Sequence, residues 1–261
     1  MCRMILMIGN FSKNKYIIEF LNQSIKKKNT PFLNSKLDVD YHKDGFGLLW
    51  KNRQDKLNIY KKPFSFDKDE NIDEIINKID SNLFIGHIRA VCPNKIKVCL
   101  KNTHPFIDND EIWCHNGSIN NFNQFKNEID KKYINKINKK MIGQTDSEFL
   151  FHFFKLLKIK NEDSEIDNLI KTIIIFFSYL NKKNYKVSGN IIYSNNNYAF
   201  ISRYINNNQS GPSLYNNTVE NSIMISSEPI LDNYSLFPNN YIKIYDLKKN
   251  KKVAEFKLNK S

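Results

Sequence analysis

The chain contains no long apolar segment. Its strongest apolar run, residues 172–180, is nine residues long, whereas a helix that spans a bilayer needs roughly 20. The apolar stretch near the N-terminus, residues 4–8, is followed at once by Gly9 and Asn10, and it is too short for the core of a signal peptide. We therefore expect neither secretion nor a membrane partner, and we expect a cytoplasmic protein.

Cysteine is scarce for a chain of 261 residues. The four cysteines are Cys2, Cys92, Cys99 and Cys114. Without a signal peptide, so few cysteines do not indicate a disulfide framework, and a reducing compartment is expected. A zinc site built from some of these cysteines with His104 and His115 is disfavoured, because no Cys-x-x-Cys pair is present and the adjacent Cys114 and His115 would point to opposite faces of a strand. We expect no metal and no cofactor.

Arginine is also rare, although the formal net charge is +13. Lysines are spread from Lys13 to Lys260, whereas arginine, the better residue for bidentate contacts to phosphates and bases, occurs four times. An AT-rich coding sequence explains this mixture of Lys, Asn and Ile more simply than a binding surface does. We therefore expect no nucleic-acid partner.

The order of the apolar patterns predicts an α+β fold. The expected strands are residues 2–8, 44–50, 57–60, 83–88, 111–115, 190–203, 222–226 and 241–256. The expected helices are residues 16–25, 67–79, 121–137, 146–157 and 166–180. Strands come first, then helices, then strands again, which favours antiparallel sheets covered by helices over a doubly wound parallel sheet. We expect one domain over residues 1–261, an irregular segment at 90–110 and a mobile surface loop at 206–217.

Several short motifs accompany Cys2. In chain order they are Gly86-His-Ile-Arg-Ala90, Asn102-Thr-His-Pro-Phe106, His115-Asn-Gly117, Thr145-Asp-Ser-Glu148 and Ser227-Glu-Pro229. With a cysteine at the second position, this set resembles the class II glutamine amidotransferases. It is most similar to their small stand-alone branch, which begins Met-Cys-Arg, has an Asp-Gly-Phe-Gly turn and includes hydrolases of γ-glutamyl compounds. The resemblance extends from Cys2 to about Pro238, and it implies the four-layer αββα sandwich of the N-terminal-nucleophile hydrolases.

The resemblance implies that Cys2 is the catalytic nucleophile once Met1 has been removed. A cysteine at the second position would otherwise be taken for an accident. The free α-amino group, whose pKa is ordinarily about 8, could accept the Sγ proton directly or through water. A Cys/His dyad using His87, His104 or His115 remains the alternative.

The same resemblance assigns Asn116 and Gly117 to the oxyanion hole, through the Asn116 side-chain amide and the Gly117 backbone N–H. Preorganised donors of this kind stabilise the charge that develops on a tetrahedral intermediate. From the two residues alone, an Asn-Gly β-turn between strands would be the better interpretation.

A glutaminyl or γ-glutamyl substrate carries an α-carboxylate and an α-ammonium, and Arg89 and Asp146 are the residues that the resemblance assigns to them. The guanidinium can grip a carboxylate through two parallel hydrogen bonds. Asp146 also lies in a helix-start pattern, Thr145 to Glu148, and both interpretations can hold together. Relatives have a small hydroxylated residue shortly after the arginine, where this chain has Val91 and Cys92.

The remaining motif residues are expected to support the site. His104 shapes the substrate pocket, and the 44–47 turn gives structural support through its glycines. No mechanism follows from the sequence for Ser227-Glu-Pro229.

Together these residues predict an amidohydrolase that cleaves the γ-amide of glutamine or a γ-glutamyl compound through a Cys2 thioester. A separate ammonia-accepting or regulatory protein is the partner that a transfer reaction would need. Hydrolysis is favoured, because only a short tail is expected after Pro238. The rival hypothesis is a catalytically silent protein of the same fold, which binds an acidic partner through its basic surface.

Overall fold

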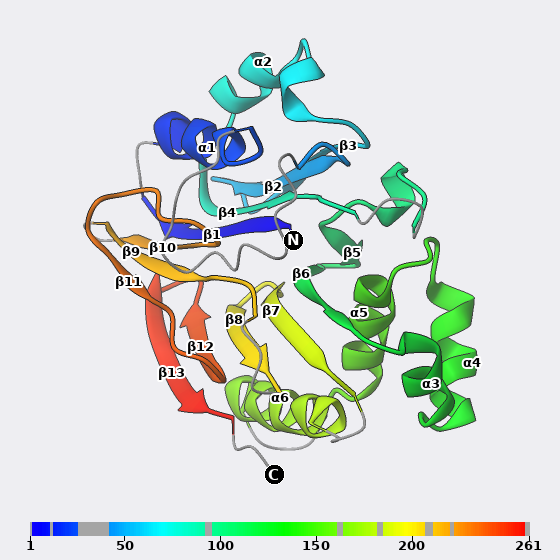
Figure 1. Cartoon of the computed structure of the whole chain (residues 1–261). Helices are drawn as coiled ribbons and strands as arrows, with labels where there is room; N and C mark the ends of the chain where they lie inside the picture. Colours follow the sequence, from blue (N-terminus) through cyan, green and yellow to red (C-terminus); the bar gives the residue numbers. More distant parts are fainter. Residues whose placement is uncertain are drawn as a thin grey trace.

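Two antiparallel sheets and the helices that cover them make up the chain in the computed structural model (Figure 1), which describes residues 2–10, 13–25, 42–91, 96–160, 164–181, 185–206, 211–219 and 222–258. The strands are β1 (Arg3–Gly9), β2 (Phe46–Asn52), β3 (Leu57–Lys62), β4 (Ser81–Ile88), β5 (Phe106–Asp108), β6 (Glu111–Ile119), β7 (Val187–Ser194), β8 (Tyr198–Ile205), β9 (Tyr215–Val219), β10 (Ser222–Ser226), β11 (Tyr234–Leu236), β12 (Tyr241–Asp246) and β13 (Lys251–Lys257). The α-helices are α1 (Lys13–Asn22), α2 (Ile72–Asn77), α3 (Phe122–Asn127), α4 (Lys131–Lys140), α5 (Asp146–Leu156) and α6 (Glu165–Leu180), and the 3-10 helices are η2 (Phe66–Lys68) and η3 (Leu100–Asn102).

The first strand lies inside the larger sheet. That sheet has seven strands in the order β11-β9-β10-β1-β4-β2-β3, and the second has six in the order β13-β12-β8-β7-β6-β5. Every pairing is antiparallel, and Ile5 of β1 lies opposite Ser226 of β10 and Gly86 of β4. The residue before β1, Cys2, is thereby fixed near the middle of the molecule.

Three hydrophobic clusters define the four layers. Met4, Leu6 and Ile8 of β1 point between the two sheets, where they meet Ile112 and Cys114 of β6. The alternate β1 residues, Ile5 and Met7, pack on the other face against α1 and α2. The third cluster fills the space between the six-stranded sheet and helices α3 to α6. Side chains point alternately to the two faces of a strand. Both faces of β1 are buried, which explains why its apolar run is continuous. The predicted αββα sandwich is confirmed.

Two predicted helices are shorter or divided in the structure. The single helix expected at 121–137 is wrong: α3 ends at Asn127, and Asp130 starts α4 by accepting a hydrogen bond from Lys132 N at 2.8 Å. Aspartate is a favoured N-cap residue, because its carboxylate accepts from the otherwise unpaired N–H groups of the first helical turn. The helix expected at 67–79 consists of η2 followed by α2, which begins at Ile72.

The late part of the chain is more ordered than the sequence suggested. Residues 207–210 of the predicted loop lie outside the described residues, but Leu214 is buried and residues 215–217 belong to β9. The strand run predicted at 241–256 forms β12 and β13, which complete one side of the six-stranded sheet, so the residues after Pro238 are not a tail. The mobile loop predicted at 206–217 is therefore wrong for its second half.

Among the described residues, no helix is both long enough and apolar enough to span a bilayer.

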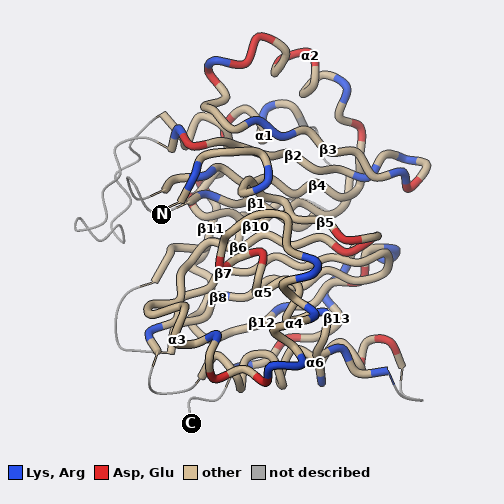
Figure 2. Tube along the Cα trace, turned by 90° about the vertical axis from the view of Figure 1, so that its right-hand side faces the viewer, with Lys and Arg blue, Asp and Glu red and all other residues tan. Residues whose placement is uncertain are grey.

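Charges of both signs are distributed over elements from α1 to α6 on the face seen in Figure 2.

Candidate active site

Cys2 lies directly before β1, with its thiol against the chain that leaves β4. Its Sγ receives the Ala90 N–H at 3.4 Å and lies 3.6 Å from the Ala90 carbonyl oxygen. Burial raises the pKa of the Cys2 thiol, although the Ala90 hydrogen bond and the charges of Arg89 and Arg3 act in the opposite direction. The thiol therefore needs a base before it can act as a nucleophile.

Asn116 connects the two sheets at this point. Its Nδ2 donates a 2.8 Å hydrogen bond to the carbonyl oxygen of Cys2, from the part of β6 that faces the inter-sheet layer. Asn116 and Gly117 do not form a turn, because β6 continues to Ile119 and pairs Gly117 with Gly189 of β7. The turn that the dipeptide alone favoured is wrong, since the flanking strand overrides it.

The backbone N–H of Gly117 points away from β7. The hydrogen bond from Asn120 N to Lys186 O, at 3.0 Å, sets which β6 residues bond to β7, because bonded pairs recur at every second residue of an antiparallel ladder. By this alternation the N–H groups of Gly117 and Ile119 face the other side, where Ile119 N donates to Asp146. The β5 pairing ends at Trp113, so neither described neighbouring strand takes the Gly117 N–H.

Gly117 also tolerates no side chain in this backbone. A Cβ atom there would lie 1.9 Å from the Ser188 carbonyl oxygen and 2.7 Å from His115 Nε2. The strand can therefore hold its position only with glycine at this residue.

Arg89 follows β4 and is held by the turn before β2. Its N–H donates to Gly45 O at 2.8 Å, and Asp44 accepts from Val91 N at 2.7 Å. Gly45 has a φ of +118°, which an L side chain rarely adopts. These contacts agree with the supporting role expected for the 44–47 turn.

The Arg89 guanidinium is buried, and its Nη1 has no hydrogen-bond partner among the described residues. Burial lowers the Arg89 pKa, while the attraction of Cys2 and Asp44 opposes that shift. A buried guanidinium with a free donor beside a thiol is suited to binding a carboxylate.

Asp146 begins α5 and lies against the end of β6. Its Oδ2 accepts from Ile119 N at 3.3 Å and its Oδ1 from Ser147 N at 2.8 Å. Thr145 caps the helix by accepting from Glu148 N, which confirms the helix-start interpretation. Glu148 does not complete a capping box: its carboxylate accepts from Ile142 N and Gly143 N and so holds the preceding loop.

The histidine side chains are not hydrogen-bond partners of the Cys2 thiol in the described structure. Cys2 Sγ bonds to the Ala90 backbone, and no imidazole hydrogen-bonds to it among the described residues. His115 Nδ1 bonds to Ser147 Oγ at 2.9 Å, on the helix side of β6. The His104 ring packs against the His87 ring, with ring centroids 4.0 Å apart and the planes tilted by 31°. This geometry does not support a Cys/His dyad.

His104 is buried, and burial lowers its pKa well below the ordinary value. Its other ring neighbour is Phe106, at 4.6 Å between centroids. Its carbonyl oxygen covers Gly47, where a Cβ would lie 2.0 Å from it. His104 is thus placed to shape the layer between the sheets, and its neutral ring is not poised to transfer protons near pH 7.

Ser227 and Glu228, for which no mechanism followed from the sequence, hold the start of β1. Ser227 Oγ accepts from Met4 N at 3.0 Å, and Ser227 N donates to Met4 O at 2.9 Å. Glu228 forms a 2.9 Å ion pair with Arg3. The Ser-Glu-Pro motif therefore anchors the strand that presents Cys2, and the motif itself was the only available signal.

Two further expectations concern cysteine chemistry. Cys114 points into the inter-sheet core while His115 faces α5, as adjacent strand residues should. Cys92, which departs from the family pattern, lies outside the described residues. Within the described ranges, no group of three or more His, Cys, Asp or Glu residues is placed to hold a metal ion.

Solved structures of similar fold include amidotransferases. A glutamine aminotransferase class-II domain protein from Silicibacter pomeroyi is 16% identical, with 98% of this chain and 99% of that chain covered and a TM-score of 0.62. A glutamine amidotransferase from Pseudomonas aeruginosa, described as predicted, is 15% identical, with 97% and 100% covered and a TM-score of 0.56. The glutamine phosphoribosylpyrophosphate amidotransferase of B. subtilis is 16% identical with a TM-score of 0.64, and this chain spans about half of its length.

No match is found among curated protein sequences. The sequence model of the class II glutamine amidotransferases, however, matches residues 21–204, which is more than half of the chain. That segment contains Arg89, Asn116, Gly117 and Asp146 but not Cys2. The chain belongs to the class II glutamine amidotransferase family.

Proposed function

We propose that this protein hydrolyses the γ-amide of glutamine or of a γ-glutamyl compound, with Cys2 as the nucleophile after removal of Met1. The observation that carries the proposal is the 2.8 Å hydrogen bond from Asn116 Nδ2 to the Cys2 carbonyl. It brings an amide donor of one sheet to the nucleophile of the other. Family membership supports glutamine amide hydrolysis in general.

In the proposed reaction, Cys2 Sγ attacks the γ-carbonyl carbon and its proton passes to the freed α-amino group. The oxyanion of the tetrahedral intermediate accepts hydrogen bonds from Asn116 Nδ2 and from the Gly117 N–H, which neither described neighbouring strand uses. The C–N bond then breaks, and the ammonium gives its proton to the departing ammonia or amine. Water hydrolyses the remaining thioester, which releases glutamate and regenerates the thiol.

Substrate binding is assigned to two charged residues, Arg89 and Asp146. Arg89, with its buried unpartnered Nη1, would take the α-carboxylate. Asp146 is partly exposed and would take the α-ammonium while it holds Ile119 N. Both groups bind glutamine and γ-glutamyl compounds equally, so the leaving amine is what distinguishes these substrates.

The decisive experiment measures ammonia or amine release from glutamine and γ-glutamyl peptides by protein whose N-terminus has been verified by mass spectrometry. Cys2→Ser is expected to lower turnover about 1000-fold or more. A matched control retains one extra residue before Cys2, so that every side chain is kept while the base is lost, and it should be comparably inactive. Full turnover by either variant would contradict the N-terminal mechanism.

An electrophilic glutamine analogue provides an independent readout. It should alkylate Cys2 and leave Cys92, Cys99 and Cys114 unmodified; labelling at another cysteine would move the nucleophile. Release of ammonia without any added protein would support free hydrolysis over transfer to a separate acceptor. Absence of any turnover, together with salt-sensitive binding to polyanions, would favour the silent binding protein.

A further inference from the structure

The outer edge of the seven-stranded sheet is strand β3 (Figure 1). The hydrogen bond from Asn52 N to Lys56 O closes the β2–β3 hairpin at 3.0 Å and sets its alternation. Asn58 and Tyr60 therefore bond to β2, whereas the N–H and C=O groups of Leu57, Ile59 and Lys61 point outward. In the described part of the chain no strand pairs with β3 on that side.

A groove of about 500 Å³ runs along this edge. Its walls come from β3, η3, β5, the loop before α5 and α5 itself, and its apolar lining includes Ile59, Leu100, Phe106, Ile142 and Phe151. Three of these side chains are unusually exposed for large aliphatic residues: Ile59 by 44%, Leu100 by 49% and Ile142 by 71%. Exposed apolar residues gathered around a concave surface are typical of a binding site for another molecule.

The strand is basic. Residues 56–62 include Lys56, Lys61 and Lys62 and no acidic residue, and Lys101 also lines the groove. Burial lowers the pKa of Lys61, whose Nζ bonds to the carbonyls of Thr103 and Pro105 and to no carboxylate in the described structure.

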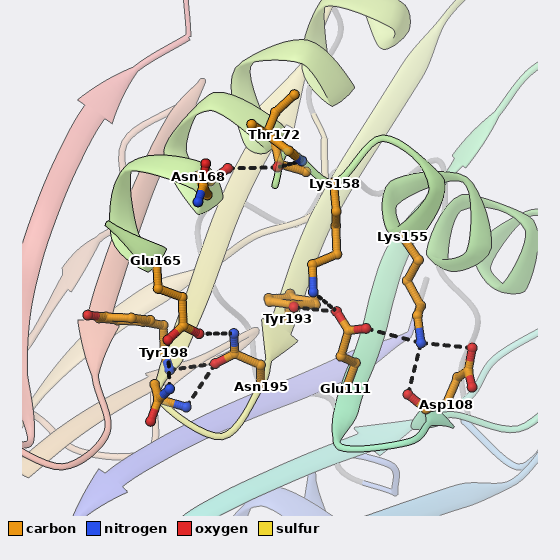
Figure 3. Close-up of polar contacts among 12 residues, drawn as sticks. Asp108, Glu111, Lys155, Lys158, Glu165, Asn168, Thr172, Tyr193, Asn195 and Tyr198 are labelled. Carbon is orange, nitrogen blue, oxygen red and sulfur yellow. Dashed lines mark hydrogen bonds and ion pairs between the residues drawn. The ribbon is translucent and has the colours of Figure 1, made fainter. Parts of the chain in front are cut away.

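The acidic side chains of the groove are already engaged. Asp108 pairs with Lys140. Figure 3 shows that Asp108 also pairs with Lys155, and that Glu111 pairs with Lys155 and Lys158. The carboxylate of Glu148 accepts two backbone N–H groups. A segment that lies along β3 therefore meets three lysines, Lys56, Lys61 and Lys62, that form no ion pair with a carboxylate among the described residues.

A second copy of the chain fits this edge poorly. Antiparallel pairing of two β3 strands about Ile59 would place Lys62 directly opposite Lys56, and like charges in facing positions are destabilising. Lysines on an edge strand generally oppose such self-pairing. An acidic strand avoids this repulsion.

We propose that β3 is a docking site for an extended, acidic segment of a partner protein, which adds an antiparallel strand to the sheet. The outward backbone groups of Leu57, Ile59 and Lys61 supply the main-chain hydrogen bonds. Alternate apolar side chains of the segment enter the groove, and its carboxylates meet the lysines at positions 56 and 62. The docking site does not depend on the reaction proposed for Cys2.

The probe is a capped eight-residue peptide, Thr-Val-Glu-Val-Asp-Ile-Glu-Thr, titrated into the full chain and followed by fluorescence anisotropy and amide hydrogen exchange. Binding should slow exchange at Leu57, Ile59 and Lys61, and it should weaken with added salt. In the peptide-free protein these three amides should exchange faster than those of Asn58 and Tyr60.

Ile59→Pro removes one outward N–H without breaking a bond to β2, and it should weaken peptide binding at least about tenfold. Ile59→Val keeps the backbone donor and should bind within about twofold. Circular dichroism checks that both variants fold, and K62E, which leaves the backbone unchanged, should also weaken binding.

Three results would overturn the proposal: protection of the Ile59 amide in the peptide-free monomer, equal binding by Ile59→Pro, or equal binding of a peptide with lysine in place of its acidic residues. A dimer that Ile59→Pro dissociates would assign the edge to a second copy instead.

Discussion

Arg3 and Glu228 form a buried ion pair of 2.9 Å between the first residue of β1 and the segment that follows β10. Arg3 is 11% exposed and Glu228 2%, so neither charge is well solvated. Beside them, Ser227 exchanges two hydrogen bonds with the backbone of Met4. The start of β1, and with it Cys2, is therefore held by residues more than 220 positions away in sequence.

Replacing Glu228 by glutamine should destabilise the protein by about 3 kcal/mol or more, because it removes the buried carboxylate charge that faces Arg3. Urea unfolding measures the change. The folded variant should also lose activity, since the strand that presents Cys2 loses its anchor.

A matched surface pair provides the control. Arg53 and Asp80 form an ion pair in which the side chains are 76% and 55% exposed. Asp80→Asn should change the free energy of unfolding by less than about 1 kcal/mol, because exposed ion pairs contribute little. Equal effects of the two substitutions would show that Glu228 has no special anchoring role.

Gly117 and Gly189 face each other across β6 and β7, and comparing substitutions at the two positions tests whether glycine is required sterically at only one of them. A Cβ on Gly117 would lie 1.9 Å from Ser188 O, whereas a Cβ on Gly189 would lie 3.4 Å from its nearest neighbour, His115 Nε2. Gly117→Ala should therefore cost about 1–3 kcal/mol of stability, as overpacking does. Gly189→Ala should stay within about 1 kcal/mol, because glycine itself weakens a strand. The reverse order in thermal unfolding would be inconsistent with this backbone.

The fold could be predicted from the sequence because the strongest patterns are local in the chain. The apolar run from Met4 to Ile8 predicts a buried strand, and in the structure it lies in β1, which is buried on both faces. Helices α5 and α6 were found within one residue of their ends. The break at Asp130 was missed because the apolar spacing of α3 and α4 continues across it. Strands β5 and β11 have three residues each, too few to show alternation, and β9 was missed because its sequence, Tyr-Asn-Asn-Thr-Val, is largely polar. All three exist through their pairing with neighbouring strands.

The motifs named the residues of the candidate site but could not give their contacts. Motif order pointed to Arg89, Asn116 and Asp146, yet no local pattern shows that the Asn116 amide reaches the Cys2 carbonyl 114 positions away. The Asn-Gly pair is the clearest case, because its intrinsic preference is a turn and the pairing of β6 with β7 decides otherwise. Such choices depend on strand register, which is a property of the assembled sheets.

Arg89→Lys tests the proposed carboxylate contact. A lysine keeps the charge but not the planar pair of donors, so KM for glutamine should rise about tenfold or more while kcat falls less. Steady-state kinetics of ammonia release measures both constants. Arg53→Lys, on the exposed surface, is the matched control and should leave KM unchanged. A fall in kcat at constant KM would assign Arg89 to the chemical step instead.

The buried imidazoles of His87 and His104, which pack against each other, predict acid sensitivity of the fold. Burial lowers the pKa of His87 to about 3 and that of His104 in the same direction. Both rings stay neutral in the folded protein, whereas the unfolded chain takes up protons near pH 6.5. Above pH 6.5 the two histidines therefore do not lower the free energy of unfolding. Below pH 6.5 this free energy falls as the pH drops toward the folded-state pKa values.

For His87, the free energy of unfolding should fall by about 1.4 kcal/mol per pH unit once the pH is well below 6.5. Urea unfolding between pH 7.5 and 5 measures this slope before most carboxylates titrate. His87→Gln removes one titrating ring and should flatten the slope by that amount, and His104→Gln should act in the same direction. If His87→Gln left the slope unchanged, His87 would accept its proton in the folded protein, which its packing against His104 between the two sheets opposes.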